Sequence, residues 1–408
     1  MRSTDVKALG GVAAEGLTVL NSVVRGMHAG IAGRVFSSIG PVAKPVEIVH
    51  NTISGMVYGG LDVAGRRLPP ALGSLAANTA VDDDAPLDEH PRAAELIAAL
   101  NGIYGDELAA KGNGLATAMA VRVAGRAVAL TSEAVSAAYP RPTERLAVFV
   151  HGLCQTESSW RRPPRPTEGP AQTADDRWYG ERLGAERGYT PVAIRYNTGL
   201  HISTNGHHLD ELLTRLVEVW PVPLTSIALV GHSMGGLVVR SACHYGHEQN
   251  RRWTRAVRQV VCLGSPHLGA DLEKGVNAAS WAMSKLRETR SVAEFLNLRS
   301  DGIKDLRFGA LVDDDWRETD PDEFLLDRCG EVPFLPHASY YFVATTAAPT
   351  AVGKVLGDHL VRPHSASGRG RRRRIPFEEE NGLVLTGLHH FDLLNNPQVY
   401  ERLREWLR

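Results

Sequence analysis

A serine flanked by glycines carries the strongest chemical signal in this sequence. Residues 231–236 read Gly-His-Ser-Met-Gly-Gly, directly after the apolar run 226–230 and directly before the helical pattern that begins at 237. A sharp strand-to-helix turn projects its central hydroxyl from the sheet, and it needs glycine neighbours because larger residues would clash. The turn also places Ser233 at the positive end of a helix. We therefore predict that Ser233 is a nucleophile, although a plain glycine-rich turn would carry the same letters.

A serine hydroxyl is a poor nucleophile near neutral pH, so it needs a histidine base that a carboxylate orients. In sites built on this kind of turn, the chain order is serine, acid, histidine. Asp358 fits the acid because it follows the apolar run 340–344. Asp313, Asp314 and Asp315 are alternatives, in an acidic stretch that reads as solvated.

The base is expected in the loop between the last predicted strand and the last predicted helix. That loop contains His389 and His390, and periodicity does not choose between them. His267 precedes the predicted acid and fits the order less well, so we interpret it as a residue that shapes the pocket floor.

Acyl transfer also requires hydrogen-bond donors aimed at the developing oxyanion. The first donor is expected to be the backbone amide after the nucleophile, that of Met234. The second comes from the loop after an early strand, where the run 146–150 leads into His151-Gly152-Leu153. The amide of Leu153 is the candidate.

The elements that position these residues follow from hydrophobic periodicity. From about residue 118, short apolar runs alternate with helical patterns, which indicates an α/β fold with a mainly parallel sheet flanked by helices. The last helix is expected at about 397–407. The predicted strands are 118–124, 126–131, 146–150, 191–195, 226–230, 258–263, 339–344 and 382–386.

The first 110 residues have a different pattern. Apolar residues at spacings of three and four over 15–36 predict an amphipathic helix, and a second periodic segment after Pro45 makes a helical hairpin. Residues 78–91 read as a linker and 91–110 as further helix. The apolar face of the hairpin needs a partner, for which we expect the rest of the protein or a second chain, with a lipid surface as the alternative.

Composition excludes several classes of protein. The 408 residues carry a net charge of -1 with a pI near 7.0, so no global field attracts nucleic acid. The basic run 369–374 reads as a solvated loop. The four cysteines form no CxxC pair, which excludes a typical zinc or redox motif and favours a reduced, cytoplasmic setting. The N-terminus does not resemble a secretion signal, and no run of 18 apolar residues predicts a membrane span.

Taken together, the motifs resemble those of α/β-hydrolase lipases and esterases, in the branch that includes GPI inositol-deacylase-like proteins. The resemblance covers roughly 118–408. The motifs that carry it are Val150-His151-Gly152-Leu153, residues 231–236, Gly264-Ser265-Pro266-His267-Leu268-Gly269, Gly357-Asp358-His359-Leu360-Val361, and His390-Phe391-Asp392-Leu393-Leu394.

This resemblance implies Ser233 as nucleophile, Asp358 as acid and His390 as base, with His389 as the alternate. It also implies a catalytic domain at 118–408, preceded by a helical region at 1–110. A long segment at about 271–336 departs from the family pattern and resembles a variable cap.

The expected activity is hydrolysis of a carboxylic ester, acyl or lipid in character, through an acyl-enzyme on Ser233. The mechanism requires no metal and no cofactor. A thioesterase or an amidase would use the same triad. A non-catalytic binding protein on the same fold is the alternative from another class, since fold does not determine function.

Overall fold

The computed structural model describes residues 86–163, 177–270, 299–317, 329–346, 361–370 and 373–408, together with nine single positions before residue 52. The chain forms two compact units. One comprises residues 1–90, 110–115 and 275–299, and the other comprises 91–109, 116–274 and 300–408. The predicted nucleophile and base both belong to the second unit, which contains the sheet.

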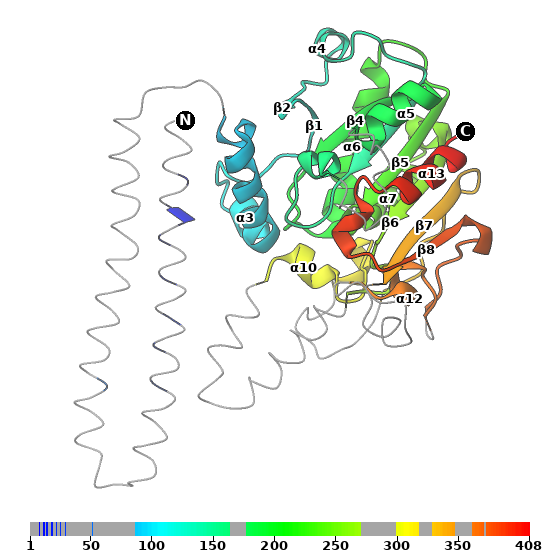
Figure 1. Cartoon of the computed structure of the whole chain (residues 1–408). Coiled ribbons are helices and arrows are strands. Elements are labelled where there is room, and N and C mark those ends of the chain that lie inside the picture. Colours follow the sequence, from blue (N-terminus) through cyan, green and yellow to red (C-terminus); the bar gives the residue numbers. More distant parts are fainter. Residues whose placement is uncertain are drawn as a thin grey trace. The chain divides into compact units, whose positions relative to one another are not determined.

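An eight-stranded sheet forms the centre of this unit (Figure 1). Its spatial order is β2-β1-β4-β3-β5-β6-β7-β8. The strand β1 pairs antiparallel with β2 and β4, and all other neighbours are parallel. The strands are β1 Ala120–Val123, β2 Arg126–Ala127, β3 Arg145–Val150, β4 Thr190–Arg195, β5 Ser226–His232, β6 Val257–Leu263, β7 Ser339–Thr346 and β8 Gly382–Thr386.

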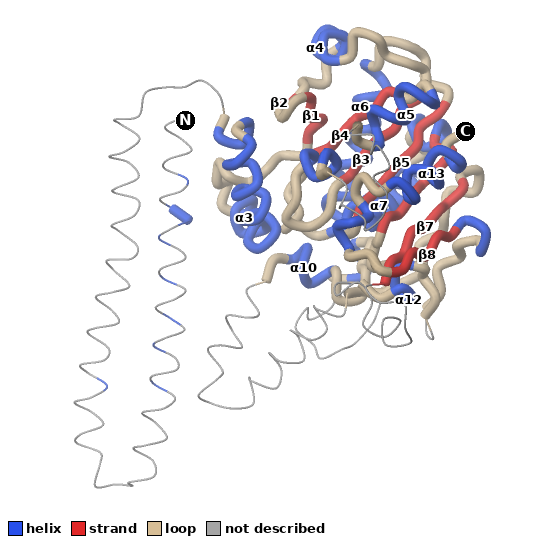
Figure 2. Tube along the Cα trace, in the orientation of Figure 1, coloured by secondary structure: helices blue, strands red, loops and turns tan. Residues whose placement is uncertain are grey.

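The central strands are buried on both faces, which explains why they read as continuous apolar runs. Five consecutive residues of β3 and six of β5 are buried. Two separate hydrophobic clusters cover the two faces: one includes side chains of α6 and α7, and the other includes side chains of α5 and α13. The sheet is therefore a middle layer between helices, as Figure 2 shows in colour, and the predicted fold class is confirmed.

The covering helices are amphipathic, and local sequence sets their ends. Helix α6 buries Leu209, Leu213 and Leu216, at helical spacing. Helix α13 begins at Pro397, after the Asn396 side chain accepts hydrogen bonds from two first-turn amides. The longer helices are α4 Ser132–Ala138, α5 Tyr179–Arg187, α6 Ile202–Val219, α7 Met234–Glu248 and α13 Pro397–Trp406, and the short ones are α10 Asp301–Asp305 and α12 Pro363–Ala366.

Short 3-10 turns connect several of these elements. They are η2 Leu87–Glu89, η3 Glu157–Arg161, η4 Arg252–Ala256, η5 Asp313–Asp315, η6 Glu379–Asn381 and η7 His390–Leu393.

Helix α3, Pro91–Ala110, joins the sheet unit through its middle part. The Asn101 side chain accepts a hydrogen bond from the Thr117 amide at 2.9 Å. The carbonyl of Gly105 accepts one from Asn197 at 2.7 Å, and the carbonyl of Gly102 accepts one from the Ser300 hydroxyl at 2.6 Å. Three stretches of chain that are distant in sequence are thus bonded to this one helix.

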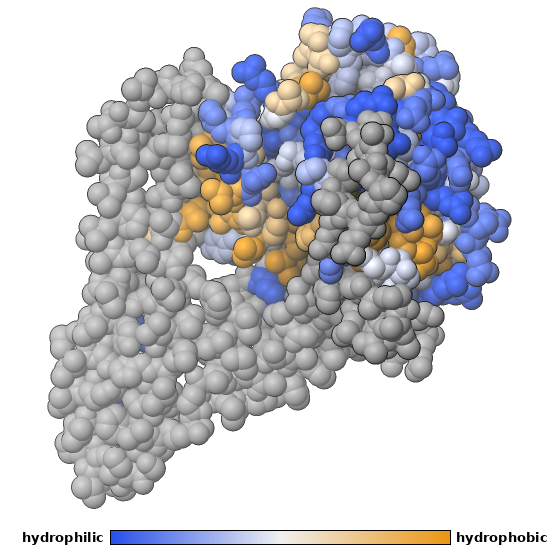
Figure 3. All heavy atoms as spheres, in the orientation of Figure 1, coloured by the Kyte–Doolittle hydropathy of each residue, from blue (hydrophilic) through white to orange (hydrophobic). Residues whose placement is uncertain are grey.

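Apolar side chains also reach the surface over α3, where Figure 3 shows them beside polar ones. Leu96 is 73% exposed and Ile103 is 57% exposed. They lie seven residues apart and therefore on one side of the helix.

All eight predicted strands are present, but their ends and directions were only partly predictable. The second strand was expected at 126–131 and spans only Arg126–Ala127. The nine described positions near the N-terminus are helical, and the Thr18 hydroxyl donates to the Ala14 carbonyl at 2.9 Å, as in a helix. Of the predicted cap at 271–336, residues 271–298 and 318–328 lie outside the described part.

The interpretation of the basic run as a solvated loop is wrong for Arg373. This side chain is buried, and its guanidinium donates to the carbonyls of His267 and Phe308. The backbone of Arg369 and Arg374 forms an antiparallel bridge, which folds the run back on itself. A charge pattern alone does not reveal carbonyls contributed by distant parts of the chain.

Candidate active site

Ser233 occupies the turn between β5 and α7 in a strained backbone conformation. Its φ is 53° and its ψ is -124°, a region that non-glycine residues rarely adopt and that costs about 1–3 kcal/mol. A Cβ added at Gly231 would lie 2.4 Å from the Gly236 nitrogen, and one added at Gly235 would lie 2.2 Å from the Val150 carbonyl oxygen. The strain predicted from the motif is therefore present, and the glycines permit the close backbone approach that the turn requires.

The loop that follows β3 lies directly against Ser233. A Cβ added at Gly152 would lie 3.0 Å from the Cβ of Ser233. Two side chains hold the loop: Gln155 accepts a hydrogen bond from the Gly152 amide at 2.9 Å, and Thr198 accepts one from the Cys154 amide at 3.2 Å. Cys154 has a positive φ of 58°, so the chain reverses sharply here.

The backbone amides of Leu153 and Met234 differ from the neighbouring backbone amides in their hydrogen bonding. The amides of Gly152 and Cys154, on either side of Leu153, both donate to side chains. The backbone amide of Ser233, which precedes Met234, donates to the Leu263 carbonyl at 2.8 Å. Within the described part of the chain, neither the Leu153 nor the Met234 N–H has an acceptor. Both predicted oxyanion donors thus remain available to a ligand.

His390 lies close to this turn, whereas its neighbour His389 is exposed. The His390 ring is 4.9 Å from the ring of His232, the residue before the predicted nucleophile. A Cβ added at Gly264 would lie 3.0 Å from Cε1 of His390. Gly264 follows Leu263, whose carbonyl binds the Ser233 amide. This placement favours His390 over His389 as the base.

Two further histidines are fully buried behind the turn. Burial lowers the pKa of His151 to about 4 and lowers the pKa of His232 well below its ordinary value. The ring of His151 stacks on Tyr196, and His232 lies between the Gln155 side chain and the His390 carbonyl, at 3.3 Å from each. Both rings are therefore neutral near pH 7 and support the turn.

The predicted acid, Asp358, lies outside the described residues, between β7 and α12. Two of the alternative aspartates have local roles. Asp313 forms an ion pair with Arg317 at 2.8 Å and contacts His207 at 3.3 Å. Asp315 accepts the amides of Leu311 and Val312, which fixes η5. Asp358 stays a prediction.

His267, expected to shape a pocket floor, is buried beside two arginines. Arg240 contacts its Nδ1 at 3.2 Å, and Arg373 donates to its carbonyl at 2.9 Å. Burial, together with both guanidinium groups, lowers the pKa of this ring well below its usual range.

Sequence reasoning missed Gln155 and Thr198, the side chains that hold the loop after β3. Gln155 also contacts His232, so it links this loop to the nucleophile turn. The only signal in the sequence is a polar residue just after a His-Gly pair. Thr198 is 44 residues from its partner and gives no local signal.

No helix among the described residues has the length and apolar character needed to cross a membrane.

Comparisons with known proteins found one family model and several solved structures that this chain resembles. Residues 189–320 match the family model described as PGAP1-like alpha/beta domain, which confirms the predicted family resemblance. The mature form of the Bacillus licheniformis lipase BlEst2 is 19% identical, with a TM-score of 0.41, over 64% of this chain and 91% of that one. Phospholipase PlaB from Legionella pneumophila is 13% identical, with a TM-score of 0.38, over 65% of this chain and 60% of that one. No curated relative matches the sequence.

Proposed function

We propose that this protein, which resembles the PGAP1-like alpha/beta domain family, is a serine hydrolase. It cleaves carboxylic esters through an acyl-enzyme on Ser233. The single observation that carries the proposal is the strained turn at Ser233, next to two amides without an intramolecular acceptor in the described part of the chain. Strain of this kind persists only where the surrounding structure enforces it, and it occurs mostly at functional sites.

In the proposed reaction, His390 removes the proton from the Ser233 hydroxyl as the oxygen attacks the ester carbonyl. The negative charge that develops on the carbonyl oxygen is held by the amides of Met234 and Leu153. The protonated His390 then gives its proton to the leaving alcohol. Asp358 is the proposed carboxylate that orients the ring.

Water completes the cycle by attacking the acyl-enzyme, with His390 again acting as base. The products are a carboxylate and an alcohol. The position of Met234 at the start of α7 adds the positive end of a helix to the oxyanion site.

The test is a panel of 4-nitrophenyl esters of rising acyl chain length, measured with wild-type protein and with Ser233→Ala. We expect turnover by the wild type and a loss of at least about 10⁴-fold in kcat for the variant. Labelling of intact protein by a fluorophosphonate, absent in Ser233→Ala, identifies the nucleophile independently. Equal turnover by both proteins would exclude Ser233.

Matched thioester and amide substrates of the same acyl chain distinguish the ester hydrolase from its alternatives. Absence of both labelling and turnover for every substrate would favour a non-catalytic role for the fold.

A further inference from the structure

A cavity lies beside the segment that follows β4. Its volume is about 460 Å³, and its wall is formed by α6, residues 116–119 before β1, Ala109 of α3, Leu130, and residues after β4. Ser233, His390, Leu153 and Met234 are not among the residues that line it. The proposed reaction makes no use of this cavity.

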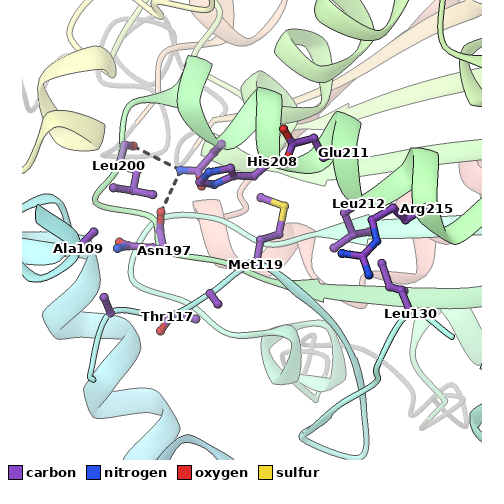
Figure 4. Close-up of a pocket in the computed structure, with 13 residues that line it drawn as sticks. Ala109, Thr117, Met119, Leu130, Asn197, Leu200, His208, Glu211, Leu212 and Arg215 are labelled. Atoms are coloured by element: carbon purple, nitrogen blue, oxygen red, sulfur yellow. Dashed lines mark hydrogen bonds between the residues drawn. The ribbon is translucent and has the colours of Figure 1, made fainter. Parts of the chain in front are cut away.

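The cavity is elongated along α6. Asn205 lines one end and Arg215 lines the other, and ten residues of helix span about 15 Å. Between them the lining is mainly apolar, with Met119, Leu130 and Leu212. Figure 4 shows Met119 between His208 and Leu212, with Arg215 next to Leu212 on the side of Leu130.

The end formed by Arg215 is cationic, and the Arg215 side chain is exposed there. Glu211 lies one turn earlier on α6, a spacing at which ion pairs are common, yet within the described residues Arg215 forms neither an ion pair nor a hydrogen bond. The other ionisable groups at the cavity are Glu211 itself and His208. An unpaired guanidinium presents donors in a planar fork, which suits a carboxylate.

The opposite end is polar and closed by hydrogen bonds. The Asn205 side chain donates to the carbonyls of Asn197 at 2.9 Å and Leu200 at 3.4 Å, as Figure 4 shows with dashed lines. The Asn197 side chain in turn donates to Gly105. An apolar chain that enters from the Arg215 end therefore meets a fixed polar wall after about 15 Å.

We propose that this cavity binds an alkyl carboxylate of medium chain length, with its headgroup on Arg215 and its chain over Met119 and Leu212. The choice of a carboxylate rests on the proposed function, because ester hydrolysis releases one. The cavity is then a second site for the acid product, or for a free fatty acid from elsewhere. Two of its lining residues, Asn197 and Leu200, flank the segment of Thr198, whose hydroxyl accepts the amide of Cys154 in the loop after β3.

The test measures binding of octanoate by calorimetry to Ser233→Ala protein, which cannot turn over an ester. We expect saturable binding of octanoate. Butanoate should bind more weakly because it buries less apolar surface, and hexadecanoate because its chain is longer than the cavity. Octyl glucoside tests the need for charge, and it should bind at least tenfold more weakly than octanoate.

Substitutions of the two charged residues Arg215 and Glu211 are expected to change octanoate binding in opposite directions. Arg215→Gln should weaken octanoate binding at least tenfold, whereas Glu211→Gln should tighten it because a nearby negative charge is removed. Glu218→Gln, at an exposed position of α6 outside the cavity, is the matched control and should change nothing. Ala116→Phe should fill the cavity and abolish binding without a change of charge.

Equal octanoate affinity in Arg215→Gln and its parent would overturn the proposal, and so would tighter binding of octyl glucoside. Weaker octanoate binding in Glu211→Gln would also overturn it, because loss of a nearby negative charge should favour a carboxylate bound at Arg215. Ester turnover by the wild type is measured separately, so binding without turnover contradicts only the proposed function. Turnover without binding contradicts only this second site.

Discussion

Individual side chains at the proposed active site have separate chemical and supporting roles. The ring of His390 packs against the turn at Ser233, through His232 and Gly264, whereas His389 is exposed. His151 and His232 are kept neutral by burial and support the loop and the turn. Gln155 connects these two parts through a single amide group.

Replacing His390 by alanine should lower kcat by roughly 10⁴-fold, because the nucleophile loses its base. His389→Ala should have little effect, since this exposed neighbour lies outside the packed turn. Turnover of a nitrophenyl ester, with circular dichroism to verify folding, checks both. A larger loss in His389→Ala than in His390→Ala would reverse the assignment.

Gln155→Ala should lower kcat about 10- to 100-fold with a smaller change in KM, because the loop that carries the Leu153 amide loses an anchor. Gln155→Glu keeps an acceptor for the Gly152 amide and should recover part of kcat. The matched control is Gln398→Ala, at an exposed position of α13. If KM rises while kcat stays constant, Gln155 contributes to substrate binding instead.

At the scale of elements, the site depends on how closely β3, β5 and α7 approach one another. The parallel pairing of β3 with β5 brings Val150 beside Gly231, and α7 begins directly above this pair. Gly235 then lies against the Val150 carbonyl with no room for a side chain. This close approach, beside the proposed oxyanion amides, therefore leaves room only for glycine at position 235.

Gly235→Ala should reduce the free energy of unfolding by about 3 kcal/mol, because backbone atoms cannot yield to a methyl group as a flexible side chain does. Urea unfolding measures the change. Gly330→Ala is the control, because a Cβ there meets nothing within 4 Å and the residue has no positive φ. Similar urea midpoints for the two variants would show that α7 shifts to accommodate the methyl group without loss of stability.

On the scale of the whole molecule, three buried histidines link stability to pH. Burial lowers the pKa of His151 to about 4 and the pKa values of His232 and His267 well below the ordinary 6.5. The unfolded chain therefore binds more protons than the native state below about pH 6.5. Stability is fully present above that pH, and it is lost as the pH falls toward 4.

The expected loss reaches about 1.4 kcal/mol per pH unit for each histidine that titrates only on unfolding. His201 acts in the opposite direction. Burial lowers its pKa, but hydrogen bonding and charge from Asp305 outweigh this effect and raise it. Its contribution is present below pH 6.5 and is lost at higher pH. Among the described histidines a net destabilisation at low pH remains, because four lowered pKa values, that of His208 included, oppose one raised value.

Urea midpoints at pH 7.0, 5.5 and 4.5 should fall steadily, and His151→Gln should flatten the decline by removing one of the three groups. The comparison of slopes is insensitive to any constant destabilisation by the variant. Midpoints that stay level over this range would show that the buried rings are protonated in the native state.

The sequence predicts those features of the architecture that depend on interactions between residues close together in the chain. Buried parallel strands are apolar runs, which is why the pattern predicts the parallel strands β3 to β8 well and the short, exposed β2 only in part, and the glycines around Ser233 indicated the strained turn. The burial of Arg373 was not predictable, because its acceptor carbonyl on His267 lies 106 residues away. The anchor of Cys154 on Thr198 is likewise a contact between distant parts of the chain.

The hydrogen bonds of α3 have a practical consequence for shortening the protein. Consider a version that begins at residue 118, where the alternating strand pattern starts. It would lack both partners of the Asn101–Thr117 hydrogen bond. It would also leave the side chains of Asn197 and Ser300 without the carbonyls to which they donate. Such a truncation should aggregate even though every proposed catalytic residue is retained. A version that begins just before Pro91 keeps these bonds, so we expect the shortest version that folds to start about 27 residues upstream of the first motif-bearing strand.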